Sequence, residues 1–212
     1  KRRGRGVNEN RFVKGQPETG VELAEDLLRI ATNYGPDTIA ACVVEPVAGS
    51  TGCLVPPKGY LERIREICDD HGILLIFDEV ICGFGRMGTP FASQAFGVTP
   101  DIMNLAKQLT NGAIPMGAVV ASAEIYQTFM EQGGPDYMLE FPHGYTYSAH
   151  PVACAAGIAA LDILEREQLP QRVAEMAPYF EAGLHALQGR PHVSDIRNFG
   201  FAGALQLHAY PG

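Results

Sequence analysis

Two residues of this chain, Asp78 and Lys107, combine a reactive side chain with a position directly after an apolar run. Asp78 follows Leu-Leu-Ile-Phe, and Lys107 follows the segment DIMNLA at residues 101–106. We expect both runs to be parallel strands of one sheet, and such sheets bind ligands at the carboxyl ends of their strands. A carboxylate and an amine in one cleft could perform acid–base chemistry and attack a carbonyl group. A lysine at a strand end could equally extend into water without a chemical role.

Lysine is rare in this chain, so the position of Lys107 is informative. The other lysines are Lys1, Lys14 and Lys58, in predicted loops or near the terminus. A lysine and a carboxylate that face one ligand suit pyridoxal phosphate, because the lysine holds the aldehyde and the acid keeps the pyridine nitrogen protonated. The ring can then accept electrons from a bound substrate. The pair Asp78 and Lys107 therefore predicts a pyridoxal phosphate site.

The stretch FDEVICGFGRMG, residues 77–88, carries two nucleotide-binding signatures that exclude one another. An apolar strand that ends in Asp78 and Glu79 resembles the Walker B strand of P-loop enzymes. Those enzymes also need a Gly-Lys pair in the phosphate loop, and this sequence contains none. The P-loop interpretation is therefore unsupported.

The second signature is G-x-G-x-x-G, formed by the glycines at positions 83, 85 and 88. In dinucleotide-binding proteins this loop opens directly into a helix, and an acid about 20 residues further on binds the ribose. Here Thr89 and Pro90 would begin the helix, and Asp101 would be the acid. The alternative, which we favour, is a glycine-rich loop that lets chain segments pack closely together.

Hydrophobic periodicity predicts the elements that position these residues. Helices are expected at 18–33, 60–70, 90–97, 151–168 and 171–188, and strands at 38–46, 72–80, 101–106 and 117–122, with a pair of strands within 193–209. The apolar run at 38–46 suits a strand buried on both faces. Alternation of strands and helices predicts an α/β fold around a mostly parallel sheet, and the later strand pair predicts a second domain from about residue 170.

Composition narrows the class of protein. The 212 residues carry a formal charge of -8 without a long basic run, which argues against nucleic acid or an anionic membrane as partner. No apolar stretch is long enough to span a membrane, and the N-terminus lacks the apolar segment of a signal peptide, so we expect a cytoplasmic protein. Five cysteines without C-x-x-C spacing predict neither a disulfide framework nor a zinc site.

Four longer segments together resemble the class III (ω-amino acid) aminotransferases, and most closely the β-alanine or ω-amino acid:pyruvate transaminases. They are VVEPVAGSTG at 43–52, LLIFDEVICGFGRMG at 74–88, PDIMNLAKQLTNGAIPMGAVV at 100–120 and HGYTYSAHPVACAAGIAAL at 143–161. The resemblance implies the fold of type I pyridoxal phosphate enzymes. Residues 1–170 would then be the central part of the large, cofactor-binding domain, and residues 171–212 the beginning of the small α+β C-terminal domain.

The resemblance also implies roles for five residues. Lys107 would be the Schiff-base lysine, which also moves a proton during the reaction, and Asp78 would bind the pyridinium nitrogen. Val80, on the same strand face as Asp78, would pack against the cofactor ring. Thr146 would bind the cofactor phosphate from the neighbouring subunit of a homodimer or dimer of dimers. Glu45 would lie near the cofactor.

Two departures from related enzymes bear on the substrate. Relatives that take ornithine or γ-aminobutyrate have a glutamate where this chain has Ser50, and a glutamine where it has Ile81. Both differences favour the branch that transfers an amino group from an ω-amino acid or amine to pyruvate. The resemblance also implies a glycine- and serine-rich phosphate loop, a ring-stacking aromatic residue and a substrate-binding arginine. We find none of these in the sequence, so we expect the chain to be part of an enzyme. Two alternatives are another type I activity, an aminomutase or racemase, and a fragment without catalysis.

Overall fold

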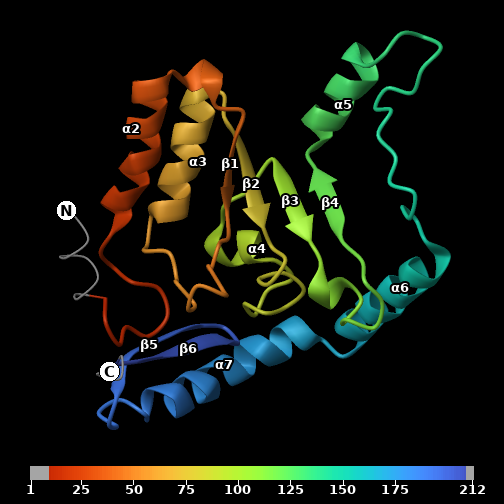
Figure 1. The fold of residues 1–212 in the computed structure, drawn as a ribbon. Helices are drawn as coiled ribbons and strands as arrows, with labels where there is room; N and C mark the ends of the chain where they lie inside the picture. The colour runs from red at the N-terminus through yellow and green to blue at the C-terminus, as the bar shows by residue number, and fades with distance from the viewer. Residues whose placement is uncertain (1–9, 209–212) are drawn as a thin grey trace.

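The computed structural model describes residues 10–208, and their central feature is a four-stranded mixed sheet. The strands are β1 (Ala41–Val44), β2 (Leu74–Asp78), β3 (Ile102–Leu105) and β4 (Ala118–Ala121), hydrogen-bonded in that order. The first three strands run parallel, and β4 is antiparallel to β3 (Figure 1). The mostly parallel sheet predicted from the apolar runs is confirmed.

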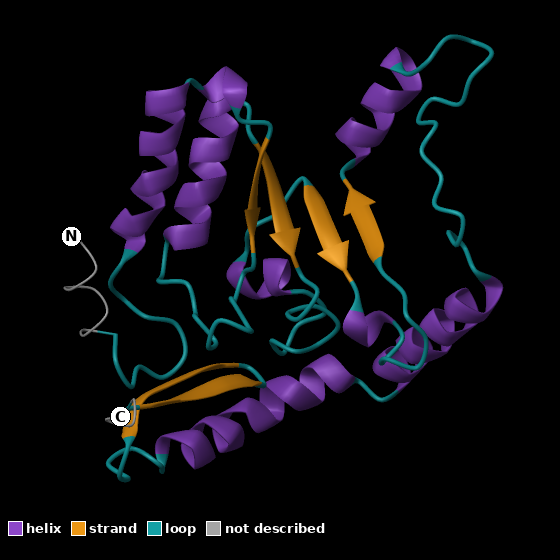
Figure 2. Ribbon diagram, viewed as in Figure 1, coloured by secondary structure: helices purple, strands orange, loops and turns teal. Residues whose placement is uncertain are grey.

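Helices precede and follow the strands, as an α/β chain requires (Figure 2). The 3-10 helices are η1 (Val21–Ala24), η2 (Pro36–Thr38) and η3 (Lys107–Leu109); the α-helices are α2 (Glu25–Tyr34), α3 (Tyr60–His71), α4 (Ala92–Phe96), α5 (Ala123–Gln132), α6 (Pro151–Arg166) and α7 (Leu169–His185). Helices α2 and α3 pack against each other beside β1. The carboxyl ends of the parallel strands point towards α6 and α7, which cross beneath the sheet in Figure 1.

The first helix and the short helix α4 begin later than predicted. The helix expected at 18–33 is a 3-10 turn followed by α2, because Gly20, with φ 124°, redirects the chain just before it. Helix α4 begins at Ala92, not at Thr89 and Pro90. The reason lies in another element: the Glu79 carboxylate accepts the N–H groups of Ala92 and Ser93, at 2.8 and 2.7 Å, and so caps the helix there.

The hydrophobic core lies between the sheet and helices α2, α3 and α4. Its buried members include Leu61, Ile64, Cys68, Leu75, Phe77 and Phe96. The expectation that β1 is buried on both faces is wrong for the described residues, since Val43 is 61% exposed. Within residues 10–208, other residues cover only the face of β1 opposite to Val43. All five cysteines are free, as the absence of paired spacing predicted.

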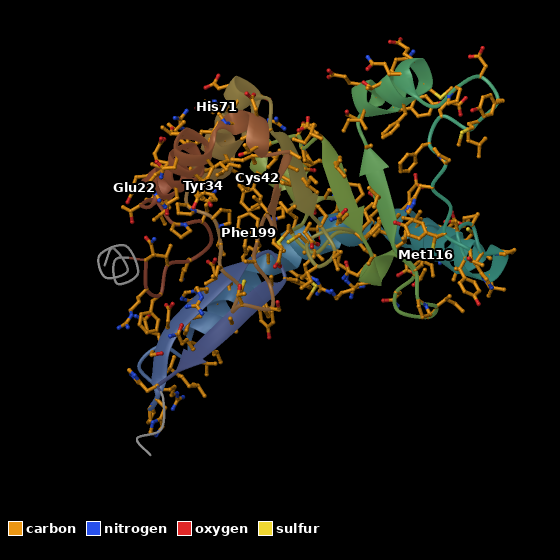
Figure 3. All side chains as sticks on the ribbon, turned by 45° about the horizontal axis from the view of Figure 1, so that its top comes forward. Glu22, Tyr34, Cys42, His71, Met116 and Phe199 are labelled. Atoms are coloured by element: carbon orange, nitrogen blue, oxygen red, sulfur yellow. The ribbon has the colours of Figure 1, made fainter. Side chains whose placement is uncertain are left out.

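The C-terminal strands β5 (Val193–Phe199) and β6 (Ala202–Leu207) form an antiparallel hairpin, as predicted. This hairpin packs onto the core: the ring of Phe199, labelled in Figure 3, stacks on Phe96 with centroids 4.8 Å apart. Arg197 Nε donates to the Gly52 carbonyl oxygen over 2.9 Å, and Asp195 accepts the N–H of Phe12 over 2.7 Å. Segments before and after residue 170 are joined by these contacts. The domain boundary expected near that residue therefore stays a prediction.

The glycine-rich loop at 83–88 packs against the C-terminal part of the chain. A Cβ atom on Gly88 would lie 3.2 Å from Cβ of Ala174 in α7. On the hairpin, a Cβ atom on Gly200 would lie 2.7 Å from both the Arg86 carbonyl oxygen and Met87 Cα. Close approach between segments therefore explains these glycines, which is the interpretation favoured from the sequence.

The dinucleotide interpretation does not fit this geometry. The loop does not open directly into a helix, and Asp101 is engaged elsewhere. Its Oδ2 accepts the N–H of Leu75 at 2.6 Å and a guanidinium N–H of Arg65 at 2.8 Å. Asp101 precedes β3 and thus lies at the end of the sheet opposite to the glycine-rich loop. A ribose at that loop could not reach this carboxylate.

Candidate active site

The structure places Asp78 and Lys107 at the same edge of the sheet. Asp78 is the last residue of β2, and its register partner in β3 is Asn104. Lys107 begins η3, two positions after Leu105, the last residue of β3. Because β2 and β3 are adjacent and parallel, both residues lie where the carboxyl ends of the strands meet. This is the arrangement that the two apolar runs predicted.

Lys107 has an unusual backbone conformation. Its φ of 48° is in the left-handed region, which residues other than Gly, Asn and Asp rarely adopt. The turn at 107–112 stabilises this conformation, since the Lys107 carbonyl oxygen accepts the N–H groups of Thr110 and Gly112, at 3.4 and 3.2 Å. The Thr110 hydroxyl donates to the Ile114 carbonyl oxygen over 2.6 Å. The Lys107 side chain itself is exposed, so it can meet a ligand.

The two neighbouring acids at the end of β2 have different environments. Asp78 is half-buried, and its Oδ1 accepts the N–H of Val80 at 3.0 Å. Its other oxygen, Oδ2, has no hydrogen-bond partner among residues 10–208. Glu79 is fully buried against α4, and burial raises the pKa of its carboxyl although the N–H groups of Ala92 and Ser93 oppose that shift. Glu79 thus has a structural role as the cap on α4.

Val80 and Glu45 both lie in loops at this edge. Val80 was expected on the strand face that carries Asp78, but β2 ends at Asp78 and Val80 belongs to the turn that follows. A turn follows the strand, in which the Val80 N–H bonds to Asp78 Oδ1 and the Glu79 carbonyl oxygen accepts the N–H of Gly83, at 3.0 and 2.8 Å. Glu45 follows β1, and its Oε2 accepts the N–H of Gly49 at 3.0 Å. A Cβ atom on Gly49 would lie 2.9 Å from Ile81 Cδ1, so the loops after β1 and β2 touch.

Thr146 is separate from this cluster. It begins a turn in the stretch that connects α5 to α6, and every residue from 134 to 150 is exposed. Figure 1 shows this connection running apart from the sheet. Within the described residues, the structure therefore brings Glu45, Asp78 and Lys107 to one edge and leaves Thr146 outside it.

Gln108, the neighbour of Lys107, was not predicted from the sequence to be a site residue. Its amide is assigned the orientation that satisfies its neighbours: the side-chain nitrogen then donates to the carbonyl oxygens of Gly83 and Phe84, at 2.8 and 3.2 Å, and the side-chain oxygen accepts from the Arg86 guanidinium. The only local signal was a polar residue between the lysine and the apolar Leu109.

A cavity beside the first helices does not lie at this edge. Its volume is about 890 Å³, and it lies between α2, α3, β1 and the segment at 10–20. Glu45 is among its lining residues, whereas Asp78 and Lys107 are not. The candidate active site is therefore defined by the strand ends and not by this cavity. No helix in the described residues is long and apolar enough to cross a membrane.

Comparison with known proteins identifies the family of this chain. The sequence matches the aminotransferase class-III family over residues 7–210, and the chain belongs to this family. A β-alanine–pyruvate aminotransferase of Pseudomonas aeruginosa is 64% identical over 197 residues, which are 92% of this chain and 44% of that protein. An omega-amino acid–pyruvate aminotransferase of Pseudomonas putida is 62% identical, over 93% of this chain and 44% of that protein.

Solved structures show the same fold. An (S)-enantioselective omega-transaminase of Thermomicrobium roseum superposes with a TM-score of 0.82 at 42% identity, over 88% of this chain and 41% of that one. The omega-transaminase of Pseudomonas jessenii in complex with PMP gives 0.83 at 41% identity, with the same coverage of 88% and 41%. The chain thus has the type I fold of this family, whose members use pyridoxal phosphate, and it spans less than half the length of these relatives.

Proposed function

We propose that the full-length protein containing this chain is a pyridoxal phosphate-dependent transaminase. It would transfer the amino group of a β-alanine-like ω-amino acid or amine to pyruvate. The observation that carries the proposal is the pair Asp78 and Lys107 at the ends of adjacent parallel strands. The names of the relatives with 64% and 62% identity support the choice of amino donor and acceptor.

The residues at this edge fit the cofactor. An exposed amine at Lys107 can hold an aldehyde, and Asp78 offers Oδ2 to a protonated ring nitrogen while Oδ1 stays bonded to Val80. Neighbouring strand ends set the separation of the two side chains before any ligand arrives, so little reorganisation is needed on binding. When bound, pyridoxal phosphate supplies an electron sink for the negative charge that develops on the substrate.

Each residue of the pair then has a separate task. Lys107 Nζ would hold the cofactor aldehyde and would be the group that moves a proton to and from the substrate carbon. Asp78 keeps the proton on the ring nitrogen by its negative charge, a preorganised electrostatic effect. Glu45 is bonded to the loop after β1 and would shape the side of the site nearest that strand.

A homodimer would complete the site. In this proposal Thr146 contacts the cofactor phosphate of the neighbouring copy, either in a dimer or in a dimer of dimers. The exposed stretch at 134–150 supports such a contact, because it carries large aromatic side chains that are exposed: Tyr145 is 71% and Tyr147 81% exposed. Exposed aromatic groups of this kind are typical of protein interfaces.

The test is attachment of the cofactor to one named lysine. The full-length protein is mixed with pyridoxal phosphate, its visible absorption is recorded, and borohydride reduction followed by peptide mass mapping locates the label. We expect an absorption band and a label on Lys107. Lys107→Ala should lose both and all turnover of β-alanine with pyruvate. Lys58→Ala, which removes an exposed lysine paired with Glu18, is the control and should retain them.

A label scattered over Lys14 and Lys58, or full turnover by Lys107→Ala, would refute the proposal. Product analysis with an amine donor and pyruvate separates transamination from an aminomutase or racemase, since only transamination forms alanine. The same labelling of the 212-residue chain alone decides whether this part of the protein binds the cofactor by itself. If the full-length protein is labelled and the 212-residue chain alone is not, the chain carries only part of the cofactor site.

A further inference from the structure

We propose that Gln108 is a positioning residue that holds Lys107 in a fixed orientation relative to Asp78. It would do so by tying the lysine turn, residues 107–112, to the glycine-rich loop, residues 83–88. This inference rests on the proposed function, because it concerns how accurately the two groups of that site are placed.

The amide of Gln108 uses both of its ends across this junction. With the amide assigned the orientation in which its nitrogen faces carbonyl oxygens and its oxygen faces a donor, the nitrogen donates to the carbonyl oxygens of Gly83 and Phe84, at 2.8 and 3.2 Å, and the oxygen accepts from the Arg86 guanidinium. Three bonds to one loop fix the direction of the planar amide. The glycine-rich loop comes directly after Asp78, Glu79 and the turn at Val80, so a group tied to it is tied to the end of β2.

Apolar packing joins the same two segments but does not set their orientation. Leu109 of the lysine turn and Phe84 of the glycine-rich loop are buried together with Leu105 in a small cluster. Such contacts are non-directional, so they allow the turn to rotate about the loop. The bonds of Gln108 oppose this rotation, because hydrogen bonds weaken steeply as their angle departs from linearity.

Backbone conformation explains why the turn needs such a restraint. Lys107 has φ 48° and Phe84 has φ 55°, so each segment contains at least one side-chain-bearing residue in the left-handed region. Residues of this kind keep that conformation only where their surroundings impose it. Gln108 is adjacent to the first and bonded to the carbonyl oxygen of the second. Without it, Lys107 would relax towards an ordinary backbone conformation and its amine would move away from its place opposite Asp78.

The experiment compares Gln108→Ala and Gln108→Glu with Gln127→Ala in the full-length protein. Gln108→Glu keeps the size of the side chain and an acceptor for Arg86 but loses both donated bonds, so it guards against simple misfolding. Gln127 is an exposed glutamine on α5 that bonds only to Glu131 among the described residues, and its replacement is the matched control. Hydrogen exchange is measured on the cofactor-free protein, and kcat and KM on the loaded enzyme.

We expect both Gln108 variants to exchange the Gly112 amide at least about tenfold faster, since a lost restraint raises local opening, with α3 and β5 unchanged. We also expect kcat to fall about 10- to 100-fold, the cost of a displacement near 1 Å at a reacting group, with little change in KM. Gln127→Ala should match the wild type in all three measurements.

Two results would overturn the proposal: Gln108 variants that behave like Gln127→Ala, or faster exchange throughout the protein, which would make Gln108 a general stability residue. Failure of the proposed function looks different. In that case the wild type itself carries no cofactor on Lys107, and the exchange measurement on the cofactor-free protein still decides whether Gln108 holds the turn.

Discussion

Replacement of Gly200 by alanine tests the close packing of the hairpin on the glycine-rich loop. Gly200 has φ 55°, so any other residue there is strained by about 1–2 kcal/mol. Its new Cβ atom would also lie 2.7 Å from the Arg86 carbonyl oxygen and from Met87 Cα, and 3.0 Å from the Met87 carbonyl carbon. Backbone atoms cannot rotate away, so this overlap should cost a further 1–3 kcal/mol or so, as overpacked cores do.

The matched control is Gly97→Ala. Gly97 ends α4 with φ 66° and has nothing within 4 Å of the position of a Cβ atom, so its replacement should cost only the backbone strain of about 1–2 kcal/mol. The difference between the two variants therefore isolates the contact between hairpin and loop. We expect Gly200→Ala to be the less stable by about 1–3 kcal/mol.

The assay is native-state hydrogen exchange at the Phe201 amide, with the unfolding midpoint in denaturant measured alongside. The Phe201 N–H donates to the Arg86 carbonyl oxygen over 2.9 Å, so its opening free energy reports the junction itself. Equal losses in Gly200→Ala and Gly97→Ala would show that the two segments do not approach this closely. The explanation of the glycine-rich loop by packing would then be wrong.

Two further predictions concern the acids at the end of β2. Because burial raises the pKa of Glu79, the folded state binds its proton more tightly than the unfolded state does. This contribution to stability is complete below the ordinary pKa of about 4.3 and is lost as pH rises through the raised value, so the unfolding free energy of the wild type should fall relative to that of Glu79→Gln over this range. A pH-independent difference in denaturant midpoints would contradict it. Asp78→Asn keeps an oxygen for the Val80 N–H but removes the charge; we expect kcat to fall about 100-fold or more while the label stays on Lys107, and near-normal kcat would remove Asp78 from the mechanism.

Strand ends and the family of this chain were predictable from the sequence, for local reasons. The apolar runs before Asp78 and Lys107 are long enough to require burial, and a parallel pairing then brings their carboxyl ends together. Helix α3 was predicted within one residue, because Gly72, in the left-handed region with φ 66°, ends an amphipathic pattern. Motifs that span most of the chain carried the class III resemblance, which the family match confirms.

Contacts between distant segments were decided only by the tertiary structure. The helix start at Ala92 depends on the carboxylate of Glu79, the residue that follows β2. The glycines of the 83–88 loop matched a dinucleotide motif by spacing, while Gly85 and Gly88 lie against Pro170 and Ala174 of α7, more than 80 positions further along the chain.

Gln108 illustrates the physical reason for this division. Its neighbours in sequence are a lysine and a leucine, and nothing in their types indicates that its amide bonds to Gly83, Phe84 and Arg86. Periodicity records which residues must be buried and at what local spacing, because burial acts on each element separately. Hydrogen bonds and close contacts depend on where folding brings two elements together. The sequence therefore determined the strand ends that present Asp78 and Lys107, and the tertiary structure alone decided which side chains surround them and hold them in place.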